Sequence, residues 1–189
     1  MILITLSGLD GSGKSTQIEM LKKFLKSQGK TFYYFHAVEF SIANRRGLIS
    51  TGNKKSVAKA NWPQIQLRKI ALLIDICRFK RLMKKLKVDY IISDRYFYDS
   101  VVNINFLSGK NKRLFAERFI PKPDFTFFLK VPPQIIMRRE RKPDQGLEYL
   151  VAKEKLYENR AKDWGMMVLD GERSREDVFS DIRKFLISN

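Results

Sequence analysis

The stretch Gly8-Leu9-Asp10-Gly11-Ser12-Gly13-Lys14-Ser15, followed by Thr16, decides the fold of this chain. It matches the pattern G-x4-G-K-S/T in full, between an apolar run at residues 2–6 and a helical pattern from Lys14 onward. Glycines let the backbone wind around a phosphate group so that successive N–H groups point inward. The helix that follows presents the positive end of its dipole to the same anion. The segment therefore predicts a phosphate-binding loop, rather than a glycine turn that only caps a helix.

Each side chain of this loop has an expected task. Lys14 is long enough to reach the β- and γ-phosphates of ATP, and the Ser15 hydroxyl is a typical Mg²⁺ ligand. We expect the nucleotide to be bound by Gly8, Gly11, Ser12, Gly13, Lys14, Ser15 and Thr16. ATP and Mg²⁺ are therefore the expected cofactors.

The rest of the sequence narrows the class of phosphate-loop protein. A regulatory GTPase needs a guanine-reading N-K-x-D motif, and Asn53-Lys54-Lys55-Ser56 lacks the aspartate and follows no strand. A motor or a transporter would need more than 189 residues. A small kinase fits this length.

A second charged motif stands at Asp94-Arg95, directly after the short apolar run 90–93. The carboxyl end of a parallel strand lies at the ligand-binding edge of the sheet. We therefore expect Asp94 to hold Mg²⁺ directly or through water. Arg95 would meet the acceptor phosphate or the transferred phosphoryl group.

Composition sets the broad class. Hydrophobic residues make up 44% and aromatic residues 12%, which suits a globular protein. No apolar run reaches the roughly 18–20 residues of a membrane span, and the N-terminus reads as a strand rather than a signal peptide. The single cysteine, Cys77, and the single histidine, His36, exclude an internal disulfide and a histidine-rich metal site. We expect a cytoplasmic location and structural roles for both residues.

The net charge of +17 predicts an attraction to polyanions, which include nucleic acid, anionic lipid and phosphorylated small molecules. No acidic residue lies between Glu39 and Asp75. The basic residues within 80–87 alternate with apolar ones at helical spacing, which is typical of a solvated helix face.

Strand and helix patterns alternate along the chain. Strands are expected at residues 2–6, 31–38, 90–93, 125–129 and 166–169. Helices are expected at 14–27, 62–86, 96–107, 112–119, 133–141, 147–162 and 175–187, with a loop or short helices at 41–59. This alternation predicts one α/β domain over residues 1–189, with a five-stranded parallel sheet and helices on both faces.

Several motifs together resemble the thymidylate kinases, a family of the nucleoside monophosphate kinases. The resemblance rests on the phosphate loop with its internal Asp10, on the helix ending at Arg78, on Asp94-Arg95-Tyr96, on the proline-flanked strand 123–133, on Arg138-Arg139-Glu140-Arg141 with Glu148 and Tyr157, and on residues 168–172. It covers most of the chain in order. It implies a three-layer P-loop NTPase fold, an acceptor-side segment at about 40–75 and a short arginine-rich lid at about 138–148.

The resemblance also implies roles for single residues. Transfer of the γ-phosphoryl group of ATP to a nucleoside 5′-monophosphate, dTMP in this family, is the implied reaction. Asp10 would contact the sugar 3′-hydroxyl, Arg139 would stack on adenine, and Arg141 would close over the phosphates. Acceptor contacts are implied for Asp10, Phe40, Arg45, Arg78, Arg95, Tyr96 and Asn103, and family members are usually homodimers. Lys14, Arg95, Arg141 and Asp10 are thus the candidate catalytic residues.

Departures from the family pattern leave alternatives open. Ser7 stands where the family usually has glutamate, and the arginine register near residues 39–46 and the base-side segment 98–105 both differ. The acceptor could thus be another nucleotide or a nucleoside. A basic P-loop protein that acts on nucleic acid is an alternative that we do not favour, because no nucleic-acid-binding motif is present.

Overall fold

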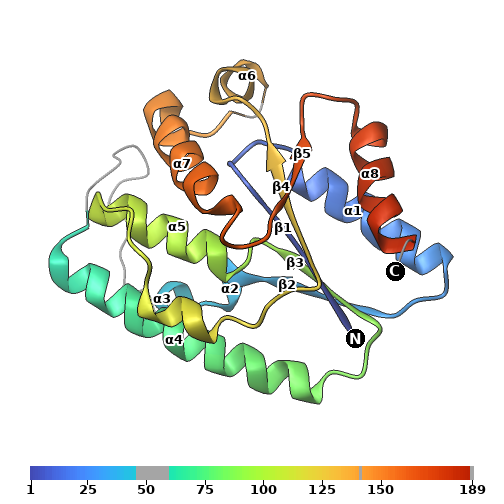
Figure 1. Cartoon of the computed structure of the whole chain (residues 1–189), viewed down its shortest axis with the longest axis horizontal. Helices are drawn as coiled ribbons and strands as arrows, with labels where there is room; N and C mark the ends of the chain where they lie inside the picture. Colours follow the sequence, from blue (N-terminus) through green and yellow to red (C-terminus); the bar gives the residue numbers. More distant parts are fainter. Residues whose placement is uncertain (46–59, 141, 188–189) are drawn as a thin grey trace.

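The computed structural model describes residues 1–45, 60–140 and 142–187 (Figure 1). Its centre is a five-stranded sheet in the order β2-β3-β1-β4-β5, in which every neighbouring pair is parallel. The strands are β1 (Ile2–Gly8), β2 (Phe32–His36), β3 (Tyr90–Asp94), β4 (Phe125–Lys130) and β5 (Met167–Asp170). The predicted five-stranded parallel sheet is therefore confirmed.

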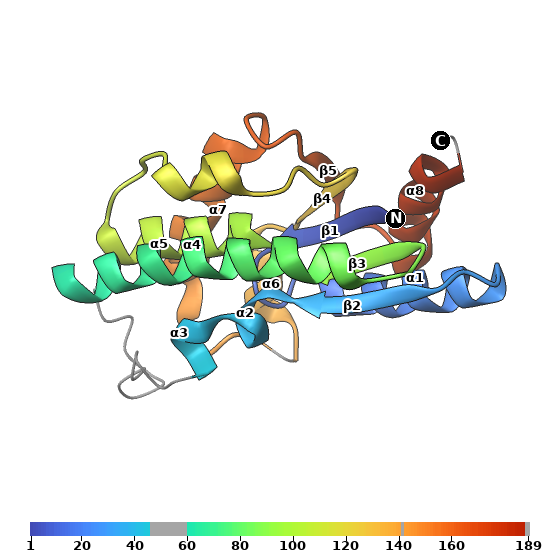
Figure 2. The same ribbon diagram turned by 90° about the horizontal axis from the view of Figure 1, so that it is seen from below.

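Helices cover both faces of this sheet, as predicted. The helices are α1 (Lys14–Ser27), α2 (Ala37–Phe40), α3 (Ile42–Arg45), α4 (Trp62–Lys85), α5 (Phe97–Ser108), η1 (Phe115–Phe119), α6 (Pro133–Arg138), α7 (Gly146–Ala161) and α8 (Arg175–Ile187). Helices α1 and α8 pack together on one face, and α4, α5 and α7 lie side by side on the other (Figures 1 and 2).

Alternation along the strands builds these two hydrophobic cores. In β1, Leu3 faces the core under α4, α5 and α7, whereas Ile4 and Leu6 face the core under α1 and α8. In β4, Phe128 and Phe127 divide in the same way. A parallel sheet buried on both faces needs such continuous apolar runs, which explains why the strands are recognisable in the sequence.

Three predicted elements end differently. The strand expected over 31–38 stops at His36, whose Nδ1 accepts a 3.3 Å hydrogen bond from the Glu39 N–H and so caps α2. The helix expected over 112–119 is only the short 3₁₀ helix η1, and the helix expected over 133–141 ends at Arg138. Part of the predicted acceptor-side segment 40–75 lies outside the described residues.

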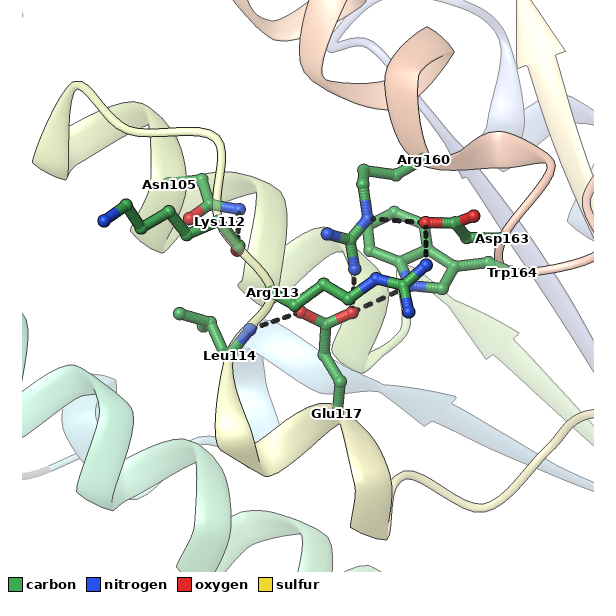
Figure 3. Close-up of polar contacts among 8 residues, drawn as sticks. All are labelled: Asn105, Lys112, Arg113, Leu114, Glu117, Arg160, Asp163 and Trp164. Atoms are coloured by element: carbon green, nitrogen blue, oxygen red, sulfur yellow. Dashed lines mark hydrogen bonds and ion pairs between the residues drawn. The ribbon is translucent and has the colours of Figure 1, made fainter.

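A buried polar network fastens η1 and the segment before it to the end of α7 (Figure 3). The Glu117 carboxylate accepts hydrogen bonds from the Arg160 guanidinium, from Trp164 Nε1 at 3.1 Å and from the Leu114 N–H at 2.6 Å. Asp163 joins the network through ion pairs with Arg160 and with the more exposed Arg113. This network fixes the C-terminal end of the helix that lines the cavity described below.

Two surface features complete the fold. The basic side chains Lys80, Arg81, Lys84 and Lys85 are exposed on α4, which confirms the predicted solvated face. Cys77 is also exposed, whereas its place in the long helical pattern predicts a packed side chain. Within residues 1–45, 60–140 and 142–187, none of the helices has the length and apolar character needed to cross a membrane.

Candidate active site

The phosphate loop leaves the carboxyl end of the central strand β1. Gly8 has φ 152° and Gly13 has φ 103°, values that favour glycine. A Cβ atom on Gly8 would stand 2.7 Å from the Leu129 carbonyl oxygen, which is too close for any side chain. The two glycines thus permit the tight turn that brings α1 to the end of the sheet.

Two polar groups of the loop point to a phosphate ligand. Lys14 is buried, and its Nζ donates to the carbonyl oxygens of Gly8 at 3.1 Å and Leu9 at 2.7 Å. Burial lowers the pKa of this amine. The Ser12 hydroxyl is buried and has no hydrogen-bond partner in the described part of the chain. A bound phosphate would supply acceptors for both groups.

Asp94 and Ser15 are the predicted metal ligands. Asp94 ends β3 beside β1, is 7% exposed and accepts a 3.1 Å hydrogen bond from the Tyr34 hydroxyl. Burial and the nearby Asp94 carboxylate raise the pKa of that phenol. Ser15 lies exposed in the first turn of α1. A carboxylate and a hydroxyl fit Mg²⁺, which prefers oxygen ligands and keeps several waters. The described residues contain no cluster of three or more His, Cys, Asp or Glu side chains that could bind a metal without phosphate or water.

Arg95 is the most constrained residue of the site. It has φ 58°, the left-handed region that a non-glycine residue adopts only when its surroundings impose it. Its N–H donates to the Leu6 carbonyl at 3.1 Å, and its carbonyl accepts from Ser93 Oγ at 2.6 Å. Its guanidinium forms an ion pair with Asp10 of the phosphate loop. The structure thus brings the predicted Arg95 and Asp10 together.

A cavity of about 400 Å³ opens beside Arg95. Asn103 on α5, a predicted acceptor residue, lines it, and His36 at the end of β2 also contributes to its wall. Other lining residues come from α4 and α7, including Arg68, Asp75, Tyr149 and Lys153. The cavity therefore lies between the sheet edge that carries the phosphate loop and the helices α4, α5 and α7.

The cavity floor contains a buried carboxylate, Asp99, which is 6% exposed. It accepts hydrogen bonds from Ser7 Oγ at 2.6 Å, the Tyr96 N–H at 2.7 Å and the Tyr157 hydroxyl at 2.6 Å. Burial, followed by the charge of Asp99, raises the pKa of the Tyr157 hydroxyl, which therefore stays protonated and donates. Asp99 thus links β1, α5 and α7 under the cavity.

Two cations in the cavity wall are absent from the sequence prediction. Arg68 on α4 has a buried Nε without a hydrogen-bond partner in the described part of the chain, and Lys153 on α7 is 6% exposed. Arg68 precedes Leu72 by four residues, so the two share one face of α4, and both line the cavity. This spacing is the local feature that could have pointed to Arg68 in the sequence.

Arg139 lies against the phosphate loop. Its Nη1 donates to the Gly11 carbonyl at 2.6 Å, and its Nη2 donates to the Gly171 carbonyl at 3.4 Å. This places the side chain beside the loop expected to bind the nucleotide, directly after α6.

Four of the predicted acceptor residues that the structure describes do not line the cavity, namely Asp10, Phe40, Arg78 and Tyr96. Arg78 donates to the Phe40 carbonyl at 2.9 Å and pairs with Asp75 at 2.7 Å, and its guanidinium stacks on the Phe40 ring at 4.3 Å. Tyr96 is fully buried, and its hydroxyl donates to the Pro121 carbonyl at 2.7 Å. Arg78 and Phe40 thus brace α4 against α2, and Tyr96 lies in the core, while their acceptor contacts remain predictions from the family pattern. The Arg45 side chain and Arg141 lie outside the described residues.

A glycine-rich loop after the central strand, a lysine at the start of the next helix and an acid-arginine pair ending the neighbouring strand define a P-loop nucleotide-binding protein. The adjoining cavity gives it room for a second small molecule. The chain belongs to the thymidylate kinase family, whose sequence profile matches residues 6–182. Members of this family are enzymes that phosphorylate nucleoside monophosphates.

Individual relatives agree with this assignment over nearly the whole chain. A probable thymidylate kinase of Archaeoglobus fulgidus is 26% identical, over 99% of this chain and 95% of its own length. The thymidylate kinase of Plasmodium falciparum is 29% identical, over 96% of this chain and 87% of its own length. The solved structure of a Candida albicans thymidylate kinase matches with a TM-score of 0.70 at 19% identity, covering 100% of this chain and 92% of that one, which shows the same fold.

Proposed function

We propose that this chain transfers the γ-phosphoryl group of ATP to dTMP and releases ADP and dTDP. The observation that carries the proposal is the Arg95–Asp10 pair, which lies in contact with both the phosphate loop and the cavity. Phosphoryl transfer needs two anions held in line with their charge neutralised. An arginine at the junction of donor and acceptor sites suits that task because its planar fork binds phosphate oxygens in pairs.

In this proposal the donor is bound by groups of the phosphate loop. Lys14 exchanges the carbonyl oxygens of Gly8 and Leu9 for phosphate oxygens, and Ser12 Oγ gains a partner. Arg139, already in contact with Gly11, lies where it can cover the nucleotide from α6. Arg141 and the lid at about 138–148 remain predictions from the family pattern.

Mg²⁺ would be held by Ser15 and by Asp94, the latter directly or through water. The ion would supply charge neutralisation for the phosphates during transfer. The location of Asp94 at the end of β3 supports this assignment, as does the hydrogen bond that Tyr34 donates to its carboxylate.

On the acceptor side, Asp10 would contact the sugar and Asn103 the base. Arg68 adds an unpaired donor, its buried Nε, from the α4 wall of the described structure. The side-chain amide of Asn103 can both donate and accept a hydrogen bond at the edge of a base.

ADP formation from Mg·ATP measured with dTMP, dUMP, UMP, CMP, AMP and GMP tests the proposed function. Turnover mainly on dTMP, abolished in Lys14→Ala, is expected. Turnover mainly on another monophosphate would change the assigned acceptor substrate and leave the proposed phosphoryl transfer from ATP intact. No turnover on any of them would overturn the proposal, and thymidine and a 5′-hydroxyl oligonucleotide would then be tried as acceptors.

We further propose a homodimer formed through α4, in the cytoplasm. Leu67, Ile70 and Ile74 are 51%, 54% and 42% exposed and follow one face of α4, away from the face that lines the cavity. An exposed thiol at Cys77 suits a reducing compartment.

A further inference from the structure

We propose that the Lys153 ammonium group binds the 5′-phosphate of the nucleoside monophosphate, as a second cation beside Arg95. The proposal rests on the proposed function and adds a residue to the acceptor site. Lys153 stands on α7, between Glu148 and Tyr157 of the family pattern, but is itself part of none of the motifs that predicted the site from the sequence.

The first argument is that Lys153 is buried but has no anionic partner. The residue is 6% exposed and lines the cavity, and within the described chain its Nζ makes no hydrogen bond and no ion pair. It lies over the Tyr149 ring, whose centroid is 4.6 Å away. Burying an ammonium group without a carboxylate partner costs free energy. An anionic ligand in the cavity would supply the missing partner and offset this cost.

The second argument is that Asp99 does not serve as this missing partner. Asp99 already accepts three hydrogen bonds, from Ser7, Tyr96 and Tyr157. The Asp99 carboxylate acts on Lys153 through its charge only. The ammonium group is therefore available to a ligand in the cavity.

The third argument is the register of α7. Residues 149, 153 and 157 recur every four positions, and so share one face of the helix. The Tyr149 hydroxyl donates to Asp10 at 3.4 Å, and the Tyr157 hydroxyl donates to Asp99 at 2.6 Å. Lys153 lies between two residues that contact the phosphate loop and the cavity floor, so the helix directs it to the phosphate end of the cavity.

The charge environment supports the same conclusion. Burial, followed by the charges of Arg95 and Lys14, lowers the pKa of Lys153 to about 7, while Asp99 acts in the opposite direction. Tyr149 and Tyr157, on the same helix, have raised pKa values and stay neutral. A dianionic phosphate would favour the protonated amine, so acceptor binding above pH 7 is expected to take up a proton.

The test compares affinities for dTMP and for thymidine, which lacks the phosphate, by titration calorimetry without ATP. Lys153→Met is expected to weaken dTMP binding by about 10- to 100-fold, the range for one charge-assisted hydrogen bond, and thymidine binding by less than about twofold. Lys155→Met is the matched control, because Lys155 is exposed on the same helix and should leave both affinities unchanged.

Two outcomes would overturn the proposal. Equal weakening for dTMP and thymidine would mean that Lys153 only supports the fold, and unchanged dTMP affinity would mean that it does not meet the phosphate. If the wild-type protein binds another monophosphate of the panel instead, the same comparison is made with that nucleotide and its nucleoside. Failure of the proposed function therefore remains distinguishable from failure of this inference.

Lys153→Arg provides a second measurement if the methionine variant does not fold. Arginine keeps its charge at every accessible pH. We expect this variant to retain dTMP affinity better than Lys153→Met would, and to lose the proton uptake that wild-type protein shows at pH 8 in buffers of different ionisation enthalpy. Proton uptake unchanged in Lys153→Arg would contradict the proposal.

Discussion

The Ser7 hydroxyl donates a 2.6 Å hydrogen bond to the Asp99 carboxylate and so joins β1 to α5 below the cavity. The family pattern places a glutamate at position 7. In this chain β1 supplies the Ser7 hydroxyl and α5 supplies the Asp99 carboxylate. The buried space below the cavity therefore still contains one carboxylate, which accepts hydrogen bonds from its neighbours. Ser7 and Asp99 lie in two segments that differ from the family pattern, and the hydrogen bond between them accounts for both differences.

Replacement of Asp99 tests this relationship. Asp99→Ala would leave three buried donors, on Ser7, Tyr96 and Tyr157, without their acceptor. We expect a loss of about 3–5 kcal/mol in the free energy of unfolding, measured by urea denaturation, because a shared buried charge is removed. Glu176→Ala on the exposed surface of α8 is the control and should change stability by less than about 0.5 kcal/mol. A loss for Asp99→Ala as small as the control's would show that the network is not stabilising.

Lys153 gives the stability a predicted pH dependence. Its pKa of about 7 in the folded protein lies below the value of 10.5 for a free lysine side chain. Between these values the unfolded chain binds more protons, so stability rises as the pH increases from about 7 toward 10.5 and levels off below about 7, where both states are protonated. We expect this residue to contribute a slope of up to about 1.4 kcal/mol per pH unit.

Urea denaturation of wild-type protein and Lys153→Met between pH 7 and 9 measures that contribution. The difference in stability between the two proteins should change with pH, whereas the difference between wild type and Lys155→Met should stay constant. Lys14, whose pKa is also lowered, is present in all three proteins, but its charge acts on Lys153, so the measured pH dependence belongs to Lys153 and its coupling to Lys14 together. Parallel curves for wild type and Lys153→Met would contradict the prediction.

Much of the site follows from local sequence. The phosphate loop needs glycines at fixed positions, and Asp94-Arg95 follows a recognisable apolar strand, so the amino-acid pattern alone places both at the same sheet edge. The strands are equally clear because both faces of the sheet are buried.

Tertiary packing decides the rest. Lys153 and Lys155 stand two positions apart on α7, and nothing local distinguishes the buried lysine from the exposed one. The family pattern assigns Arg78 to the acceptor and does not single out Arg68, although the helical phase of α4 turns Arg68 toward the cavity while Arg78 pairs with Asp75. Helix phase depends on which neighbours pack against the helix, and a short motif does not specify it.

Arg139 is expected to act on the donor nucleotide alone. Its hydrogen bond to the Gly11 carbonyl places it against the phosphate loop, away from the cavity lining. Arg139→Ala should raise the KM for ATP by about tenfold, equivalent to ~1.4 kcal/mol, and leave the KM for dTMP within about twofold. Steady-state kinetics with each substrate varied in turn measures this, with Arg183→Ala on the exposed surface of α8 as control. An increase confined to the KM for dTMP would show instead that Arg139 contacts the acceptor nucleotide.

The network of Figure 3 is expected to stabilise the end of α7. The side chains of Arg160 and Glu117 are only 8% and 13% exposed. Glu117→Gln should therefore cost about 3–5 kcal/mol in the free energy of unfolding, since it leaves a buried guanidinium uncompensated. Arg113→Met removes the exposed pair with Asp163 in the same network and should cost less than about 1 kcal/mol. Chemical denaturation of both variants checks the prediction. Equal losses in the free energy of unfolding would contradict it.

The exposed apolar face of α4 makes the homodimer testable independently of catalysis. Ile70 is 54% exposed, and a glutamate in its place would put two like charges near the symmetry axis of a dimer formed through this face. Ile70→Glu should therefore elute as a monomer of 22.2 kDa, at concentrations where the wild type has twice that mass by light scattering. Ile187→Glu, which changes a 68% exposed residue on α8, should leave the wild-type mass unchanged. Because Ile70 faces away from the cavity, the monomeric variant should still bind dTMP. A wild-type protein that is itself monomeric would refute the proposed dimer and leave the phosphoryl-transfer proposal intact.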